Sequence, residues 1–189
     1  METITLTKDN CEHISGNLYS WTPPTEIMEC NLIINGVNLA CKSALHCKGA
    51  LSCEGGCLTI RGALSCEDNL SCEDCLSCSG DLSCKGNLRC ESNLYCRDLC
   101  CNGNLSCNGN LSCGGSLSCK GILLCRGGLS CEGDLFCNSN LFCGKGLFCE
   151  GILSCDGNLS CGVGLSCEGG LSCEGKLSVM SNEHSRSSK

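Results

Sequence analysis

The chain has 189 residues, of which 27 are Cys and 25 are Gly, and its formal net charge is −7. This acidic balance argues against a nucleic-acid-binding role, which favours a basic face, and an aromatic content of 3% is too low for a conventional globular core. No apolar run reaches the roughly 18 residues of a membrane span, and the start, METITLTKDN, lacks the basic and apolar segments of a signal peptide. We therefore expect a cytoplasmic protein with reduced thiols, while an extracellular or surface location stays open.

The first 31 residues stand apart because they do not follow the repeat that fills the rest of the chain. They contain the only Trp, Trp21, together with Tyr19 and the pair Pro23-Pro24. A repeat structure has open strand edges at its ends, which recruit other strands unless something covers them. We expect residues 1–31 to form a cap or a docking arm, with Tyr19 and Trp21 as candidate capping side chains.

Residues 32–179 repeat the hexad L-S-C-x-G-x, as in CNGNLSCNGNLSC at residues 101–113. Of the 25 units, those opened by Leu32 and Leu51 have seven residues and the one opened by Leu94 has five. Leu, Cys and Gly alternate with Ser and two variable positions, and a period of two is typical of a strand with one buried face. The recurring Gly excludes a helix and predicts a corner, in which Gly would take a positive φ.

Short strands that alternate with corners predict an all-β protein, a single-stranded parallel β-helix (β-solenoid) whose coils hydrogen-bond along one axis. Three hexads per coil give a triangular cross-section of about 18 residues, and two give a flattened two-sided coil of about 12 residues. We favour the triangle, because Leu and Cys then fill the interior together, whereas a flat coil sets each Cys against a Leu. The predicted core ladder includes Leu105, Cys107, Leu111, Cys113, Leu117 and Cys119.

The hexad, with its aliphatic anchor and small inward residue, resembles the repeats of hexapeptide β-helix proteins and of bactofilin-like proteins. The resemblance covers residues 32–179. From the bactofilins it implies a three-sided β-helix that polymerises end to end, and from the hexapeptide acyltransferases it implies a catalytic His with long loops that leave the coil. The chain is also similar to the Cys-rich β-solenoids among insect antifreeze proteins, which implies ice binding.

Three roles for the repeated Cys stay open. Ile34, Ile60 and Val179 replace it in three units, which favours a small buried hydrophobe that packs between Leu columns. Disulfides between adjacent coils meet the required Cα spacing, although parallel side chains fit the torsion poorly. Three cysteines lie off the regular register and are candidates for special pairs: Cys57, Cys75 and Cys100.

Metal binding is the third role, and thiolate sites usually contain C-x₂₋₄-C pairs. Only one cluster has the C-x₂-C spacing, formed by Cys72, Cys75 and Cys78, and two of its members are ordinary repeat positions. We therefore predict no metal site and no cofactor. Catalysis is also not expected, since the three histidines are scattered and no loop exceeds one inserted residue; they are His13, His46 and His184.

Ser fills most outward positions, and the exceptions cluster. Phe136, Phe142 and Phe148 replace Ser in three consecutive hexads near Leu124, and a triangular coil places one Phe on each face. Grouped apolar residues often mark interfaces, so these four residues form a candidate interface, with tolerated drift as the alternative. A second outward cluster lies beside the five-residue unit, where we expect a bulge or kink: Arg89, Tyr95 and Cys100.

The leading functional prediction is a structural, self-assembling solenoid that forms filaments or a layer by end-to-end association. Residues 180–189 are expected to be a disordered polar tail, with nothing bulky enough to cap the last coil. The alternatives are an ice-binding solenoid with outward Ser columns and a disulfide-hardened coat or surface protein. We expect no nucleic-acid partner, no transmembrane segment and no small-molecule ligand.

Overall fold

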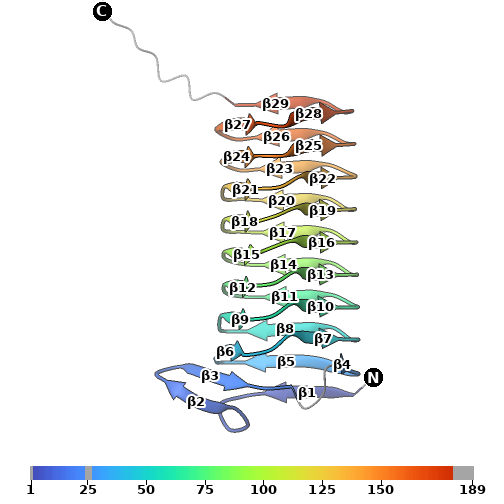
Figure 1. Cartoon of the computed structure of the whole chain (residues 1–189). Helices are drawn as coiled ribbons and strands as arrows, with labels where there is room; N and C mark the ends of the chain where they lie inside the picture. Colours follow the sequence, from blue (N-terminus) through green and yellow to red (C-terminus); the bar gives the residue numbers. More distant parts are fainter. Residues whose placement is uncertain (1, 24–26, 181–189) are drawn as a thin grey trace, which may run out of the picture.

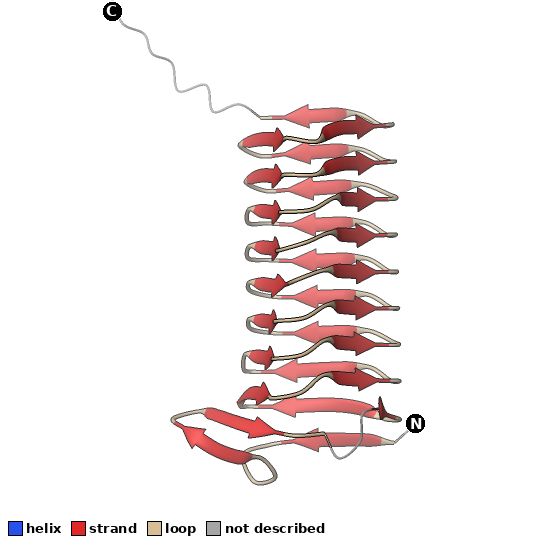
Figure 2. Cartoon of the chain, viewed as in Figure 1, coloured by secondary structure: helices blue, strands red, loops and turns tan. Residues whose placement is uncertain are grey.

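The computed structural model describes residues 2–23 and 27–180, and every regular element in this part of the chain is a β-strand (Figure 2). The strands stack into one column with the first strands at one end and the last strands at the other (Figure 1). Successive strands enter three sheets in turn, and these sheets contain ten, nine and ten strands. The fold is therefore the predicted triangular β-solenoid, and the flattened two-sided coil is excluded.

We name the sheets A, B and C. Sheet A contains β1 (Thr3–Leu6), β5 (Asn31–Asn35), β8 (Leu51–Glu54), β11 (Leu70–Cys72), β14 (Leu88–Cys90), β17 (Leu105–Cys107), β20 (Leu123–Cys125), β23 (Leu141–Cys143), β26 (Leu159–Cys161) and β29 (Leu177–Val179). Sheet B contains β2 (Glu12–Ser15), β3 (Leu18–Trp21), β6 (Asn38–Cys41), β9 (Leu58–Ile60), β12 (Leu76–Cys78), β15 (Leu94–Cys96), β18 (Leu111–Cys113), β21 (Leu129–Cys131), β24 (Gly146–Cys149) and β27 (Gly164–Cys167). Sheet C contains β4 (Ile27–Met28), β7 (Leu45–Cys47), β10 (Leu64–Cys66), β13 (Leu82–Cys84), β16 (Leu99–Cys101), β19 (Leu117–Cys119), β22 (Leu135–Cys137), β25 (Ile152–Cys155) and β28 (Gly170–Cys173).

The register keeps each hexad position in a column of its own. Leu pairs with Leu and Cys with Cys one coil further on, as for Leu105 with Leu123 in sheet A. The pairing survives units of unusual length, because Leu88 still pairs with Leu105 across the coil that contains the five-residue unit. A slip of one residue would turn the buried face of a strand outward, so the corners absorb the length differences instead.

The five-residue unit shortens one corner without breaking a sheet. Pairing between β12 and β15 stops one residue short, and Cys96 on β15 is 8% exposed, but Leu99 resumes the register opposite Leu82. At this corner the Arg97 guanidinium bonds the Asp81 carboxylate of the preceding coil at 2.8 and 2.9 Å, which lowers the pKa of Asp81. The expected bulge or kink is thus limited to one missing residue pair between β12 and β15.

The N-terminal residues extend the column. β1 pairs parallel with β5, β3 with β6 and β4 with β7, and β2 forms an antiparallel hairpin with β3 (Figure 1). Leu6 and Met28 are 2% and 4% exposed, and the half-buried Tyr19 and Trp21 pack against the same core. The interior of the column is therefore covered at this end.

The corner glycines correct one expectation, because they do not supply a positive φ. Among the described residues only four glycines have one: Gly16, Gly36, Gly55 and Gly170. The corners of the regular hexads need Gly for space. A Cβ on Gly121 would lie 2.5 Å from Asn104 Oδ1 and 2.6 Å from the carbonyl oxygen of Gly103 in the preceding coil. At this position, coils stacked about 4.8 Å apart leave no room for a Cβ that points toward the preceding coil.

Asparagines at the last hexad position tie the corners together. The backbone N–H of Asn87 donates to Asn69 Oδ1, that of Asn104 to Asn87 Oδ1 and that of Ile122 to Asn104 Oδ1, each at 2.8 Å. These N–H groups lie between strands, so the sheets do not supply their acceptors, and an unpaired backbone donor is costly where water is excluded. Each Asn side chain thus reaches along the axis to the coil that follows.

Candidate functional site

The interior of the solenoid is built as predicted from Leu and Cys. The six residues of the predicted core ladder are each at most 1% exposed. They belong to three strands on three sheets, β17, β18 and β19, so one coil brings a Leu and a Cys inward from every side. The interior is therefore a stack of identical apolar layers.

The inward cysteines form three columns of free thiols. Sheet C has the longest one: Cys47, Cys66, Cys84, Cys101, Cys119, Cys137, Cys155 and Cys173. All 27 cysteines of the chain lie within the described residues, all are free and 21 are buried. The sulfurs of Cys96 and Cys113 are 3.6 Å apart, which is a contact distance and not the roughly 2 Å of a disulfide bond.

The thiols also have a polar task that the sequence analysis missed. Most inward Sγ atoms are directed toward a corner, where they donate to backbone carbonyls. Cys66 lies 3.0 Å from Gly49 O in the preceding coil, and Cys131 lies 3.0 Å from Gly115 O and 3.4 Å from Asp134 O. Cys is a small hydrophobe with a weak S–H donor, so it fills the core and faces the polar corner at once. No other small apolar side chain combines these two properties.

Burial sets the chemistry of these thiols. It raises the pKa of Cys47 and of Cys131 to about 12, and the neighbouring thiols of the column add to the effect. Cys161 is raised to about 11 by burial alone. The thiolate is the form that attacks electrophiles and binds metals, so Cys47, Cys131 and Cys161 are poor nucleophiles and poor ligands.

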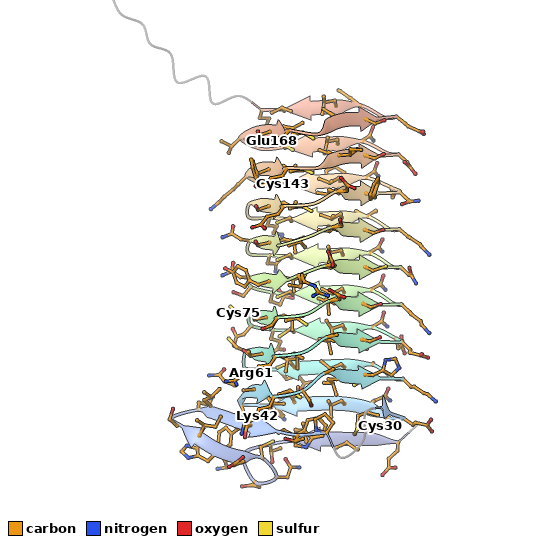
Figure 3. All side chains as sticks on the ribbon, in the orientation of Figure 1. Cys30, Lys42, Arg61, Cys75, Cys143 and Glu168 are labelled. Atoms are coloured by element: carbon orange, nitrogen blue, oxygen red, sulfur yellow. The ribbon has the colours of Figure 1, made fainter. Side chains whose placement is uncertain are left out.

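The structure separates the three cysteines with metal-like spacing. Cys72 is buried on β11 of sheet A and Cys78 on β12 of sheet B, while Cys75 lies half-exposed at the corner between these strands. Figure 3 shows Cys75 at the edge of the column. Within residues 2–23 and 27–180, no three or more His, Cys, Asp or Glu side chains are arranged to hold a metal ion.

The three Phe residues lie on three different sheets. Phe136 is on β22 of sheet C, Phe142 on β23 of sheet A and Phe148 on β24 of sheet B. Phe136 and Phe142 are 40% and 38% exposed, and Phe142 pairs with Leu124 on the outer face of sheet A. The three Phe residues therefore surround the column and do not form a single flat patch.

The outer face of sheet B carries a shallow groove of about 670 Å³. Tyr95 lies at one end of the groove, and Phe148 and Val163 lie at the other. Between Tyr95 and Phe148, the outer face carries Ser112 on β18 and Ser130 on β21. Three corner glycines line the groove beside these serines and add no side chain to it: Gly128, Gly146 and Gly164. No charged side chain lines the groove, so it offers apolar contact and hydroxyl groups but no acid or base beyond Tyr95.

The histidines do not come together in the described part of the chain. His13 lies on β2 of sheet B, where its Nε2 is 3.1 Å from Gly16 O, and His46 lies on β7 of sheet C, 3.7 Å from Glu67. His184 falls outside the described residues.

The C-terminal end of the column differs from the other end because its core is open. Leu171, Leu177 and Val179 are 44%, 45% and 41% exposed, whereas Leu153 and Leu159, one coil earlier, are fully buried. β27, β28 and β29 are the last strands of their sheets, so each has one unpaired edge. An exposed apolar section bordered by strand edges is the strongest feature for binding that the molecule presents.

Comparison with known proteins finds no relative: no family model, no curated protein and no solved structure matches the chain. The β-solenoid is shared with the groups that the hexad resembles, but membership of the bactofilin or hexapeptide families is not supported. No helix in the described residues has the length and hydropathy needed to cross a bilayer.

Proposed function

We propose that this protein is a structural β-solenoid that associates end to end with a second copy of itself. The exposed core at the C-terminal end, formed by Leu171, Leu177 and Val179, is the observation that carries the proposal. The last coil exposes the inward-facing side chains whose counterparts in every interior coil are buried. Residues 181–189, SNEHSRSSK, contain no apolar side chain.

The two ends of the column favour a particular contact. At the N-terminal end Leu6 and Met28 are already buried, so a C-terminal end finds no exposed core there. Two C-terminal ends offer each other matching apolar sections and open strand edges, and a contact of one surface with itself closes into a two-fold pair. Filaments need a second contact, for which the outer edges of β1, β2 and β4 are available.

The proposal is tested by sedimentation velocity and negative-stain electron microscopy of the full chain under reducing conditions. The wild type is expected to sediment as a pair or larger, and the double variant Leu171→Lys, Leu177→Lys as a single rod, because two buried cations would oppose the contact. Phe136→Lys is the matched control, since Phe136 has a similar exposed fraction but lies on the side of the column.

Two results would contradict end-to-end association. One is a wild type that remains a single rod at every concentration, and the other is a Phe136→Lys variant that dissociates as completely as the end variant. Wild-type filaments in electron micrographs would indicate that a second contact, at the N-terminal end, joins the pairs. Circular dichroism verifies that each variant keeps its β-structure.

Ice binding has no observation in its favour. The outward Ser columns are interrupted on every sheet, and no column contains more than two successive Ser before another residue type intervenes. Examples of these interruptions are Arg89, Tyr95, Cys100 and Phe148. A flat regular array, which ice recognition would require, is therefore missing. A disulfide-hardened coat is also not favoured, because 21 thiols are buried and free.

A further inference from the structure

One pair of cysteines lies outside the core and in adjacent coils. Cys57 directly precedes Leu58 and Cys75 directly precedes Leu76, and these two leucines are partners in the pairing of β9 with β12. The backbone N–H of Leu58 donates to Cys75 O at 2.9 Å, which places the two corner residues one above the other. Both cysteines are half-buried, whereas the core columns are buried apart from Cys167 and Cys173 near the open end.

From this juxtaposition we infer that Cys57 and Cys75 form a redox-active dithiol site, which closes to a disulfide across two coils when a small disulfide such as oxidised glutathione is supplied. Corner residues of adjacent coils are stacked about 4.8 Å apart, and disulfides need Cα atoms about 4.4–6.8 Å apart. Neither residue belongs to a strand, so the side chains are free of the packing that constrains the core columns.

The direction of the side chains at this corner supports the pair. Cys57 and Cys75 occupy positions that Asn holds in the coils on either side of them, Asn38 and Asn93. There the side chain reaches the coil that follows: Asn38 Oδ1 accepts from the N–H of Cys57 at 2.8 Å, and Asn93 Oδ1 from the N–H of Asn110 at 2.8 Å. The Cys57 side chain follows the same direction, toward Cys75.

The environment of the two sulfurs agrees with this arrangement. Burial raises the pKa of Cys57, the N–H of Cys75 opposes that rise and the Cys75 thiol adds to it, so the side chain of Cys57 is close to both groups of Cys75. The Cys75 sulfur lies 3.5 Å from Ser92 Oγ in the following coil. Closure of the disulfide therefore requires a rotation about χ1 of Cys75 that turns its sulfur from Ser92 toward Cys57.

The reaction is an exchange in which every atom is accounted for. One of the two thiolates attacks a sulfur of oxidised glutathione, the S–S bond breaks and one glutathione thiolate leaves. The second protein thiolate attacks the protein sulfur of the mixed disulfide, and the other glutathione thiolate leaves. Two protein thiols are oxidised, one glutathione disulfide is reduced, and the two thiol protons end on the two glutathione molecules.

The other cysteines differ in ways that the test can use. The core thiols are buried apart from Cys167 and Cys173 near the open end, so a peptide-sized oxidant does not reach the others. Cys100 is exposed on the outer face of sheet C, but its neighbours in the column are Ser83 and Ser118. It therefore has no second thiol to resolve a mixed disulfide and is the matched control.

The experiment incubates the reduced full chain with oxidised glutathione under native conditions, alkylates the remaining thiols in acid denaturant and maps the peptides by mass spectrometry. Cleavage after Glu54 and Arg61 isolates Cys57 on the peptide 55–61. The wild type is expected to lose two hydrogens through a cross-link between this peptide and the one that contains Cys75, while Cys100 carries glutathione.

The variants distinguish a paired site from two independent thiols. Cys57→Ser and Cys75→Ser are each expected to lose the cross-link and to carry one glutathione on the remaining corner thiol, whereas Cys100→Ser keeps the cross-link in full. Glutathione on both Cys57 and Cys75 without a cross-link would overturn the inference. So would cross-links from Cys57 distributed among several other cysteines. Neither outcome depends on whether the protein self-associates.

Discussion

At the scale of single residues, four positions of the hexad have identifiable physical tasks. Leu supplies apolar volume, Cys fills the space between Leu columns and directs an S–H toward the corner, and the last position offers an Asn oxygen to the coil that follows. Gly supplies clearance: at Gly121 the nearest atoms to a Cβ are only 2.5 and 2.6 Å away. These tasks differ in how strictly they select the residue: Leu opens all 25 units, whereas the Gly position holds other residues in several of them, among them Asp68, Ser92 and Ser139.

A substitution at this Gly tests the need for clearance. Gly121→Ala is expected to destabilise the protein by about 1–3 kcal/mol, because the added methyl group meets backbone that cannot move without shifting a coil. Gly114→Ala is the control, since the nearest atom to its Cβ is 4.0 Å away, and it should change stability by less than about 0.5 kcal/mol. Urea denaturation followed by circular dichroism gives both values, and equal effects would contradict the steric explanation.

At the scale of elements, three-residue strands such as β17 have no stability of their own. They persist because each strand pairs with a strand on either side and each rung is packed between identical rungs. Sheet B already contains an aliphatic rung, Ile60, which pairs with Cys78 and is fully buried. The column therefore accepts a different apolar side chain, provided that its volume is similar.

This tolerance leads to a prediction for Cys119, a fully buried member of the sheet C column. Cys119→Val should cost less than about 1.5 kcal/mol because volume and polarity are nearly kept. Cys119→Asp should prevent folding, because no partner is present for a buried carboxylate. Thermal melts of both variants provide the comparison. If the Val variant were as unstable as the Asp variant, the thiol itself would be essential and the packing role would be wrong.

At the scale of the whole molecule, buried thiols make the fold sensitive to alkali. The pKa of Cys47 and of Cys131 rises from an ordinary 9.0 to about 12 in the folded protein. Below pH 9 these thiols hold their protons in both states and have no effect on the pH dependence. Between about pH 9 and 12 the unfolded chain loses protons that the folded chain keeps, so stability falls as the pH rises.

The expected result is a thermal midpoint that is constant from pH 6 to 8 and falls steeply above pH 9 under reducing conditions. Each buried thiol contributes up to about 1.4 kcal/mol per pH unit, and the total margin of a folded domain is only about 5–15 kcal/mol. Cys100→Ser, at an exposed position, should leave the profile unchanged. A midpoint that stays constant up to pH 11 would show that the core thiols ionise in place.

Much of this architecture could be predicted from the sequence, because alternation and corners are local properties. The period of two identifies Leu105 and Cys107 as inward neighbours, and three hexads per coil place Phe136, Phe142 and Phe148 on separate sheets. The first prediction needs only the spacing of residues along one strand, and the second also needs the choice of a triangular coil.

Other features depend on which residues lie one coil apart, and only the stacked structure shows them. The reason for Gly121, the Asn ladder and the S–H contacts of the thiols all come from the coil beneath, not from neighbours in the chain. The pairing of Cys57 with Cys75 and the groove between Tyr95 and Phe148 have the same origin. The hexad alone predicted a β-solenoid with a Leu and Cys interior and favoured the triangular coil over the flattened one. Its tertiary structure decided which corners are crowded, which thiols are accessible and which end of the core is open, because these depend on contacts along the axis.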